Sequence, residues 1–233
     1  MKKKILFISP TGTLDNGAEI SIVNLMEYLV QTGHQVINAI PDYHVAVQQD
    51  YISSLAALGI ETIALPSVKW WWEDAPGGLP DSPESRARSY QESTSALRKI
   101  LTERKIDLVI TNTVNMFQGA VAAACENVPH FWLIHEFPDG EFGYYKEKIE
   151  LINQLSDKIF AVKGELFQTL LEYFPAEKLL PFVPYSDVTL IDLPSSDIVR
   201  LVSIGGISER KNQLELIKAY HLLNKSDIEL VFI

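Results

Sequence analysis

The sequence predicts an α/β protein in which a Rossmann-like, doubly wound parallel sheet is followed by one βαβ unit of a second Rossmann-like domain. Short apolar runs of strand length alternate along the chain with longer segments of helical period. Several of the short runs are apolar at every position, as expected for parallel strands covered on both faces. This alternation implies right-handed crossovers and helices on both sides of the sheet.

The elements of the first domain follow one another along the chain with little interruption. The expected strands are Ile5–Ser9, Gln35–Ile40, Glu61–Leu65, Leu108–Thr111, Phe131–His135, Lys158–Val162 and Leu179–Val183. The expected helices are Ala18–Thr32, Val45–Leu58, Glu84–Arg104, Phe117–Glu126, Tyr144–Leu155 and Glu165–Tyr173. Gly33 and Gly59 follow the first two helices directly, where a left-handed cap residue is favoured.

Two stretches break this rhythm. Residues 66–83 carry three consecutive tryptophans, then glycines and prolines, which predicts a long irregular loop of a kind that is often functional. Residues 184–197 are polar and marked by prolines, as in a linker. We therefore expect an N-terminal domain over 1–184, a linker over 185–198 and the start of a second domain over 199–233.

The strand–helix pattern restarts after this linker. It predicts a strand over Arg200–Ile204, a turn, a helix over Glu209–Leu223 and a strand over Glu229–Ile233. A lone βαβ unit cannot bury its own sheet and helix faces, so we expect the second domain to be truncated. Its apolar faces would then dock on another surface, for example in a homodimer.

Composition argues against several classes of protein. The formal net charge of −10 argues against sequence-independent nucleic-acid binding, which depends on clustered cations. The single cysteine, Cys125, excludes an internal disulfide framework and fits a reducing cytosol; its alanine-rich helix predicts that it is buried. No run reaches the roughly 20 apolar residues of a membrane span. The histidines share no metal-ligand spacing, so no metal is expected.

The first strand–helix turn contains Gly12 and Gly17, and its helix is expected to start near Ala18. Glycines let a backbone approach a ligand closely, and free N–H groups at a helix start bind phosphate. The spacing is not that of a dinucleotide fingerprint, and no P-loop lysine follows. An ordinary turn entering a parallel sheet explains these residues equally well.

The turn of the second domain is richer in positive charge. Gly205 and Gly206 precede a helix start that carries Arg210 and Lys211. Two glycines, a helix N-terminus and adjacent cations together favour a diphosphate site. The two cations are equally consistent with solvated residues of a first helical turn.

Polar residues stand where two strands of the first domain end. His135 follows the apolar run HFWLI and precedes Glu136, while Asn112 and Thr113 end the run LVITN. Ligands of open α/β sheets bind outside the carboxyl ends of the strands. His135 is therefore a candidate hydrogen-bonding group or general base, and the others are candidates for binding hydroxyl groups. The alternatives are that His135 anchors its loop and that Asn112 and Thr113 cap the next helix.

The tryptophan triplet also allows more than one interpretation. Trp71 and its neighbours would stack on the apolar faces of sugar rings, contact lipid at a membrane surface, or hold the long loop on the core.

Taken together, these segments resemble the family 4 (group 1) glycosyltransferases of the two-Rossmann-domain, GT-B type. The segment KILFISPTGTLDNGAEISIVNLMEYLVQTGHQV is similar to the opening of that family, with a glycine loop ending in Gly-Ala-Glu and a Gly-His turn before the second strand. DLVITNT and WLIHEFPD resemble its later strand ends. RLVSIGGISERKNQLELIKAYHLLNKSDIELVFI is similar to the first βαβ unit of its nucleotide-sugar-binding domain.

The resemblance implies transfer of a sugar from a nucleotide-diphosphate donor, usually with retention of configuration, to a glycan, lipid-linked or protein acceptor. It implies that Gly17 and Ala18 approach the donor phosphates, that His135 lies beside the transferred sugar, and that Lys211, with Arg210, neutralises the leaving diphosphate. It further implies a cytoplasmic enzyme at the inner membrane face that contacts the membrane peripherally.

The chain departs from the family pattern in two respects. Gly205-Gly206 stands where the family often has Gly-Arg, and the paired glutamates and the base and ribose pocket would lie beyond Ile233. We therefore expect little activity from this chain alone. A non-catalytic carbohydrate-binding or scaffold module with the same fold is the alternative. A nicotinamide-dependent oxidoreductase is disfavoured because the dinucleotide fingerprint is missing.

Overall fold

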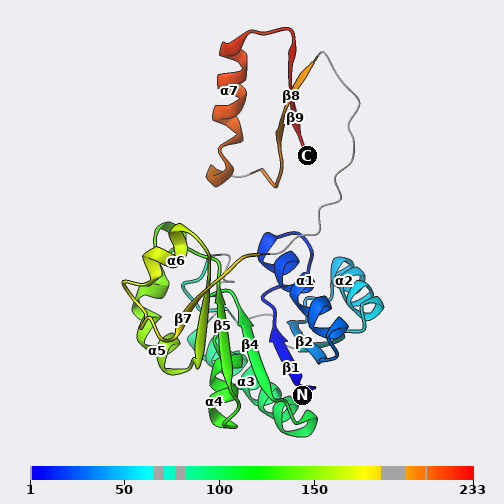
Figure 1. The fold of residues 1–233 in the computed structure, drawn as a ribbon, viewed down its shortest axis with the longest axis vertical. Coiled ribbons are helices and arrows are strands. Elements are labelled where there is room, and N and C mark those ends of the chain that lie inside the picture. Colours follow the sequence, from blue (N-terminus) through cyan, green and yellow to red (C-terminus); the bar gives the residue numbers. More distant parts are fainter. Residues whose placement is uncertain (1, 66–70, 77–81, 185–197, 208) are drawn as a thin grey trace. The chain divides into compact units, whose positions relative to one another are not determined.

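The structure, a computed structural model, describes residues 2–65, 71–76, 82–184, 198–207 and 209–233. The chain divides into two compact units, Met1–Ser186 and Asp187–Ile233 (Figure 1). The first unit holds a seven-stranded sheet and the second a two-stranded sheet.

All seven strands of the first unit are parallel and follow the order β3-β2-β1-β4-β5-β6-β7. The strands are β1 (Lys4–Ile8), β2 (Gln35–Pro41), β3 (Glu61–Leu65), β4 (Leu108–Asn112), β5 (His130–Ile134), β6 (Lys158–Val162) and β7 (Leu179–Phe182). Each predicted strand lies within one residue of these bounds. The predicted doubly wound parallel sheet is confirmed.

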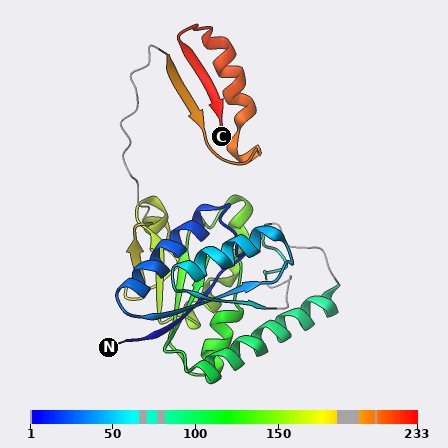
Figure 2. The same ribbon diagram turned by 90° about the vertical axis from the view of Figure 1, so that its right-hand side faces the viewer.

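Helices cover both faces of this sheet. They are α1 (Gly17–Gln31), α2 (Ala46–Ala57), α3 (Pro83–Arg104), α4 (Gln118–Cys125), α5 (Ile149–Gln154) and α6 (Glu165–Leu170). Alternate residues of β1 point to opposite faces: Ile5 and Phe7 pack in one core cluster with α1 and α2, and Leu6 and Ile8 in another with α3 and α4. Figure 2 shows α1 and α2, in blue and cyan, on the side of the sheet opposite α3.

One helix prediction and one burial prediction need correction in the first unit. Residues 144–155 do not form one helix, because a 3₁₀ helix, η1 (Gly140–Lys148), precedes the short α5. The hydroxyl of Tyr145, which is fully buried on η1, donates to the carbonyl of Glu136 at 2.8 Å, so local anchoring decides the backbone geometry there. Cys125 is exposed, because it ends α4 on the side away from the sheet-facing alanines Ala122 and Ala123.

The second unit is a βαβ unit of β8 (Val199–Ser203), α7 (Gln213–Leu223) and β9 (Ile228–Phe232), with the two strands parallel. A 3₁₀ turn, η2 (Glu209–Lys211), precedes α7, so the predicted helix starts later than residue 209. Asn212 lies between them with φ 54°, which interrupts the helical path. The two strands pair with each other and do not extend the seven-stranded sheet.

Gly12 gives a test of how tightly the first loop is built. Its φ is +67°, and a Cβ there would lie 2.7 Å from Ile40 Cδ1 and 2.9 Å from Ile40 Cβ. Gly12→Ala should therefore lower the free energy of unfolding by roughly 2–4 kcal/mol, through backbone strain and overpacking. Gly17→Ala is the matched control, since its Cβ would meet no atom within 4 Å. Equal urea midpoints for the two variants would contradict this account.

Candidate functional site

The candidate site lies where the carboxyl ends of β1, β4 and β5 meet. These strands are neighbours in the sheet, and the strand order reverses at β1, whose partners are β2 on one side and β4 on the other. Loops after the strands on either side of such a switch point diverge and leave room for a ligand. The predicted residues Asn112, Thr113, His135 and Glu136 all lie at this edge.

The side chain of Asn112 connects α1 to β5. It is fully buried at the end of β4; its Nδ2 donates to the carbonyl of Ala18 at 3.3 Å, and its Oδ1 lies 2.9 Å from His135 Nε2. Because a carbonyl oxygen can accept only from the Nδ2 end of the Asn112 amide, that end faces Ala18 and the amide oxygen faces the histidine. His135 therefore carries its proton on Nε2.

This leaves Nδ1 of His135 as a hydrogen-bond acceptor without a partner among the residues that the structure describes. Burial lowers the pKa of His135 to about 4, so the ring is neutral at physiological pH. Its ring also packs edge-on against Phe182, with centroids 5.3 Å apart. The site thus holds a neutral, oriented imidazole.

The side chain of Glu136 connects the loops after β4 and β5 by hydrogen bonds. Its Oε2 accepts from the main-chain N–H of His135 at 3.0 Å and from that of Val114 at 3.3 Å. Burial raises the pKa of this carboxyl to about 7, while these main-chain donors partly oppose the shift. Glu136 is therefore close to half-protonated at neutral pH.

Thr113 has an unusual backbone. Its φ is +71°, which is rare for a β-branched residue and marks local strain. Two hydrogen bonds hold this strained turn. The carbonyl of Thr113 accepts from the buried Trp132 Nε1 at 2.7 Å, and its amide donates to the carbonyl of Leu133 at 2.9 Å. Its hydroxyl accepts from the amide of Asn115 at 3.3 Å.

The start of α1 presents unbound amide groups at this edge. Asn16 caps the helix by accepting from the amide of Glu19 at 3.0 Å. The amides of Gly17 and Ala18, at the first two helical positions, have no acceptor within the described ranges of the chain. Such N–H groups at a helix start favour an anion.

The two described tryptophans of the triplet hold their loop on the core. Trp71 Nε1 donates to the carbonyl of Pro10 at 3.1 Å, and Trp72 Nε1 donates to that of Val114 at 3.0 Å. The ring of Trp72 stacks on Phe117 with centroids 4.0 Å apart. The loop-anchoring alternative thus holds for both, while Trp70 lies outside the described residues.

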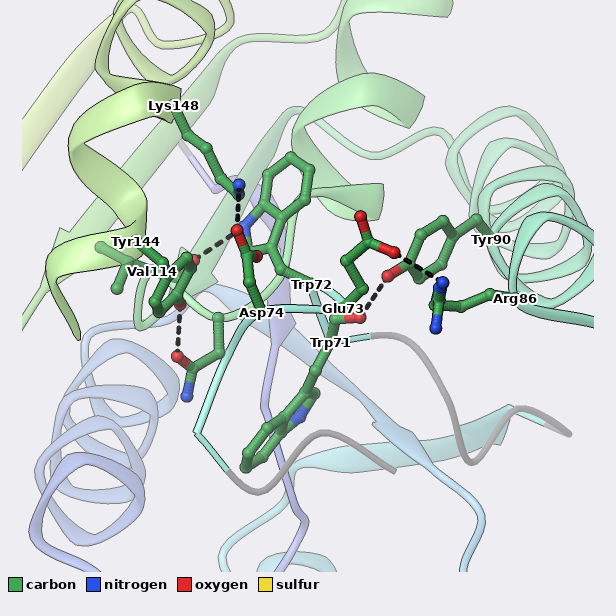
Figure 3. Close-up of polar contacts among 10 residues, drawn as sticks. Trp71, Trp72, Glu73, Asp74, Arg86, Tyr90, Val114, Tyr144 and Lys148 are labelled. Carbon is green, nitrogen blue, oxygen red and sulfur yellow. Dashed lines mark hydrogen bonds and ion pairs between the residues drawn. The ribbon is translucent and has the colours of Figure 1, made fainter. Parts of the chain in front are cut away.

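Ion pairs complete the anchoring of this loop (Figure 3). Lys148 of η1 pairs with Asp74 at 2.7 Å and lies 5.0 Å from the centroid of the Trp72 ring. Arg86 of α3 pairs with Glu73 at 2.6 Å, and the hydroxyl of Tyr90 donates to the carbonyl of Trp71 at 2.6 Å.

In the second unit, Gly205 follows β8 with φ 126°. A Cβ at Gly205 would lie 3.9 Å from Lys211 Nζ, so the ammonium group of this lysine lies beside the glycine backbone. Gln213 Nε2 donates to the carbonyl of Gly206 at 3.0 Å and holds the loop to the start of α7.

Sequence reasoning missed Glu19, which is fully buried beside the first loop. Its Oε1 accepts from the amide and hydroxyl of Thr11, both at 2.9 Å, and from the amide of Gly12 at 3.0 Å. A signal was present, because Glu19 stands on the same helical stripe as Ile22 and Met26, which face the core.

In the described part of the chain, no helix is long and apolar enough to cross a bilayer. The same residues contain no group of three or more His, Cys, Asp or Glu side chains arranged to hold a metal ion.

The fold and the edge of the sheet define a Rossmann-like domain of the GT-B glycosyltransferase type. Residues 15–180 match the family model described as Glycosyltransferase Family 4. The chain belongs to this family. No curated protein sequence matches the chain.

Solved structures show the same fold over almost the whole chain. A glycosyltransferase from Rickettsia africae superposes with a TM-score of 0.64 at 16% identity, covering 99% of this chain and 68% of that one. UGT2 of Phytolacca americana, complexed with UDP-2-fluoro-glucose and pterostilbene, gives 0.61 at 15% identity, covering 100% and 72%. A UDP-N-acetylglucosamine 2-epimerase gives 0.62 at 14% identity, covering 99% and 63%.

The chain spans about two thirds of the length of these structures, between 63% and 72%. At such identities the likeness concerns the fold alone. Because an epimerase shares it, the fold does not decide between transfer and epimerisation.

The raised pKa of Glu136 predicts a pH-dependent stability. Between the unfolded value near 4.5 and the folded value of about 7, the folded state keeps a proton that the unfolded state has lost. The contribution of Glu136 to stability therefore falls as pH rises through this window and is constant above it. Glu136→Gln removes the charge and keeps an oxygen for both amides, so it should stabilise the protein at pH 8 by about 2 kcal/mol and not at pH 4.

The quantity to measure is the difference in free energy of unfolding between variant and parent across this range. His135, whose pKa is lowered, contributes the opposite slope between about 4 and the ordinary histidine pKa of 6.5, and the subtraction removes that contribution. Glu27→Gln, on the outer part of α1, is the control. A difference for Glu136→Gln that stays constant from pH 4 to pH 8 would show that its carboxyl is not desolvated.

Proposed function

We propose that this chain provides the acceptor-side domain and the start of the donor-binding domain of an enzyme that transfers a sugar from a nucleotide-diphosphate sugar. The acceptor would be a glycan, a lipid-linked saccharide or a protein, and the configuration at the anomeric carbon would be retained. Family membership supports the reaction class. The neutral, oriented His135 at the switch point is the observation that carries the assignment of the site.

His135 is suited to a position beside the transferred sugar. Departure of a nucleoside diphosphate leaves positive charge on the sugar ring in an oxocarbenium-like transition state. A neutral imidazole does not oppose that charge, whereas an imidazolium would. Its free Nδ1 accepts a hydrogen bond from a sugar hydroxyl and so orients the ring, while Asn112 holds the Nε2 side.

The leaving diphosphate needs hydrogen-bond donors and cations. We assign the free amides of Gly17 and Ala18 to the donor phosphates from the first unit. Arg210 and Lys211, which follow the Gly205-Gly206 turn, would neutralise the charge from the second unit. With these groups in place the reaction would need neither a metal nor another cofactor.

The acceptor would bind on the side of Glu136. A carboxyl that is half-protonated near neutral pH is able to accept a proton from an attacking hydroxyl. Asn112, Thr113 and Trp71 belong to the neighbouring strand ends and loop and would contact hydroxyl groups or a sugar face.

The enzyme would act in the cytoplasm at the inner membrane face, with peripheral membrane contact and without nucleic acid. It would form dimers through the apolar faces of the second unit.

The donor assignment is tested by replacing one lysine. In the full-length protein, Lys211→Ala should weaken binding of the preferred UDP- or GDP-sugar by roughly 10- to 100-fold, the loss expected for a charge-assisted hydrogen bond. Lys225→Ala removes the same charge beyond the far end of α7 and should leave affinity unchanged. Titration calorimetry measures both. Parent protein that binds no sugar nucleotide would favour the non-catalytic module instead.

The role of His135 is tested by kinetics. His135→Ala should lower kcat by about 100-fold while donor affinity changes little, because a positioning contact made in the transition state is lost. His44→Ala, at an 81% exposed side chain, is the matched control and should leave kcat unchanged. Full activity of the His135 variant would rule out a role for this ring at the transferred sugar.

A further inference from the structure

The carboxyl group of Glu19 is held inside the first strand–helix loop. The residue is fully buried, and its Oε1 accepts three hydrogen bonds from Thr11 and Gly12 at 2.9–3.0 Å. A buried carboxyl group without such donors would be unfavourable. The loop therefore supplies the donors that a bound anion needs, and the carboxyl oxygen of Glu19 takes them up.

Two of the three donors are consecutive main-chain amides. The N–H groups of Thr11 and Gly12 converge on one oxygen, and Gly12 adopts a positive φ of 67° that brings them together. Successive amides arranged in this way form an anion-binding concavity, or nest. In this chain the nest is filled by Glu19, so it is closed to a phosphate.

The filled nest lies next to the unbound amides of Gly17 and Ala18. Three side chains hold the intervening backbone. Glu19 accepts from the amide of Gly12 at its start, Asn16 caps the helix, and Asn112 donates to the carbonyl of Ala18. The backbone that leads to the two free amides is thus held at its start by Glu19 and at the helix by Asn16 and Asn112.

We propose that Glu19 is a positioning residue that occupies the Thr11–Gly12 nest and thereby directs the donor diphosphate to the amides of Gly17 and Ala18. This inference rests on the proposed function for its ligand, although the filled nest itself does not. Oε2 of Glu19 has no hydrogen-bond partner in the described part of the chain. Glutamine therefore keeps the oxygen that accepts from Thr11 and Gly12.

The nest is tested by chemical rescue. Glu19→Ala empties the nest, which should lower the melting temperature. Formate at roughly 50–100 mM should then restore part of the loss by binding the vacated amides. The same formate should not raise the melting temperature of Glu27→Ala, on the same helix but outside the loop. Equal effects of formate on both variants would overturn the nest.

The positioning role is tested by donor affinity in the full-length protein. Glu19→Gln should bind the sugar nucleotide within about threefold of the parent. Glu19→Asp, whose carboxylate is one methylene shorter, should bind it about tenfold more weakly, and so should Glu19→Ala, with formate restoring affinity. Parent-like affinity in both shortened variants would overturn the role, and if Glu19→Ala does not fold, Glu19→Asp decides alone. A parent protein that binds no sugar nucleotide would instead refute the proposed function. The formate experiment would then still test whether Glu19 fills the nest.

Discussion

The side-chain amide of Asn112 is the interaction on which the site depends. Asn112 is the last residue of β4; its side-chain amide donates to the first turn of α1 and accepts from the ring of His135 after β5. Three segments that are distant in sequence therefore share one buried hydrogen-bonding group. Because the amide has one donor end and one acceptor end, its contact with Ala18 determines the tautomer of His135. A parallel sheet makes this possible, since all its strands deliver their carboxyl ends to the same edge.

The two acidic residues near this edge are stabilised by main-chain amides. Glu19 accepts from Thr11 and Gly12, and Glu136 accepts from Val114 and His135. No ion pair involves either carboxylate within the ranges that the structure describes. The first unit thus presents main-chain donors and a neutral histidine, whereas in the second unit the ammonium group of Lys211 lies beside Gly205. On the proposed function, attraction for the diphosphate is divided between dipoles from one unit and charges from the other.

Local sequence patterns were sufficient for the sheet but not for the chemistry of its edge. Continuous apolar runs such as ILFI and LVIT predict buried parallel strands, because period and composition are local properties. The same reasoning placed His135 and Asn112 at one edge, since topology brings strand ends together. It did not predict their contact, which depends on the orientation of two side chains 23 residues apart.

The misses have the same physical origin. Glu19 was overlooked as a functional group because a carboxylate on the buried stripe of α1 is tolerable only with donors from the preceding loop, which no local pattern encodes. The anchoring of Trp72 depends on Val114, and its cationic neighbour Lys148 comes from η1, so neither contact is visible in the sequence WWWED. The exposure of Cys125 reflects its place at the end of α4, where the alanine pattern that suggested burial stops.

A shared fold leaves the reaction open, because a 2-epimerase and glycosyltransferases superpose on this chain almost equally well. Family membership favours transfer, and the electrostatics of the edge agree with it. Sugar transfer generates positive charge on the ring and negative charge on the leaving group at the same moment. A site for this step must avoid a cation beside the ring and supply donors beside the phosphates. On the proposed function, the neutral His135 and the open amides of Gly17 and Ala18 would meet these two opposite demands within a single hydrogen-bonded unit, because Asn112 contacts both His135 and Ala18.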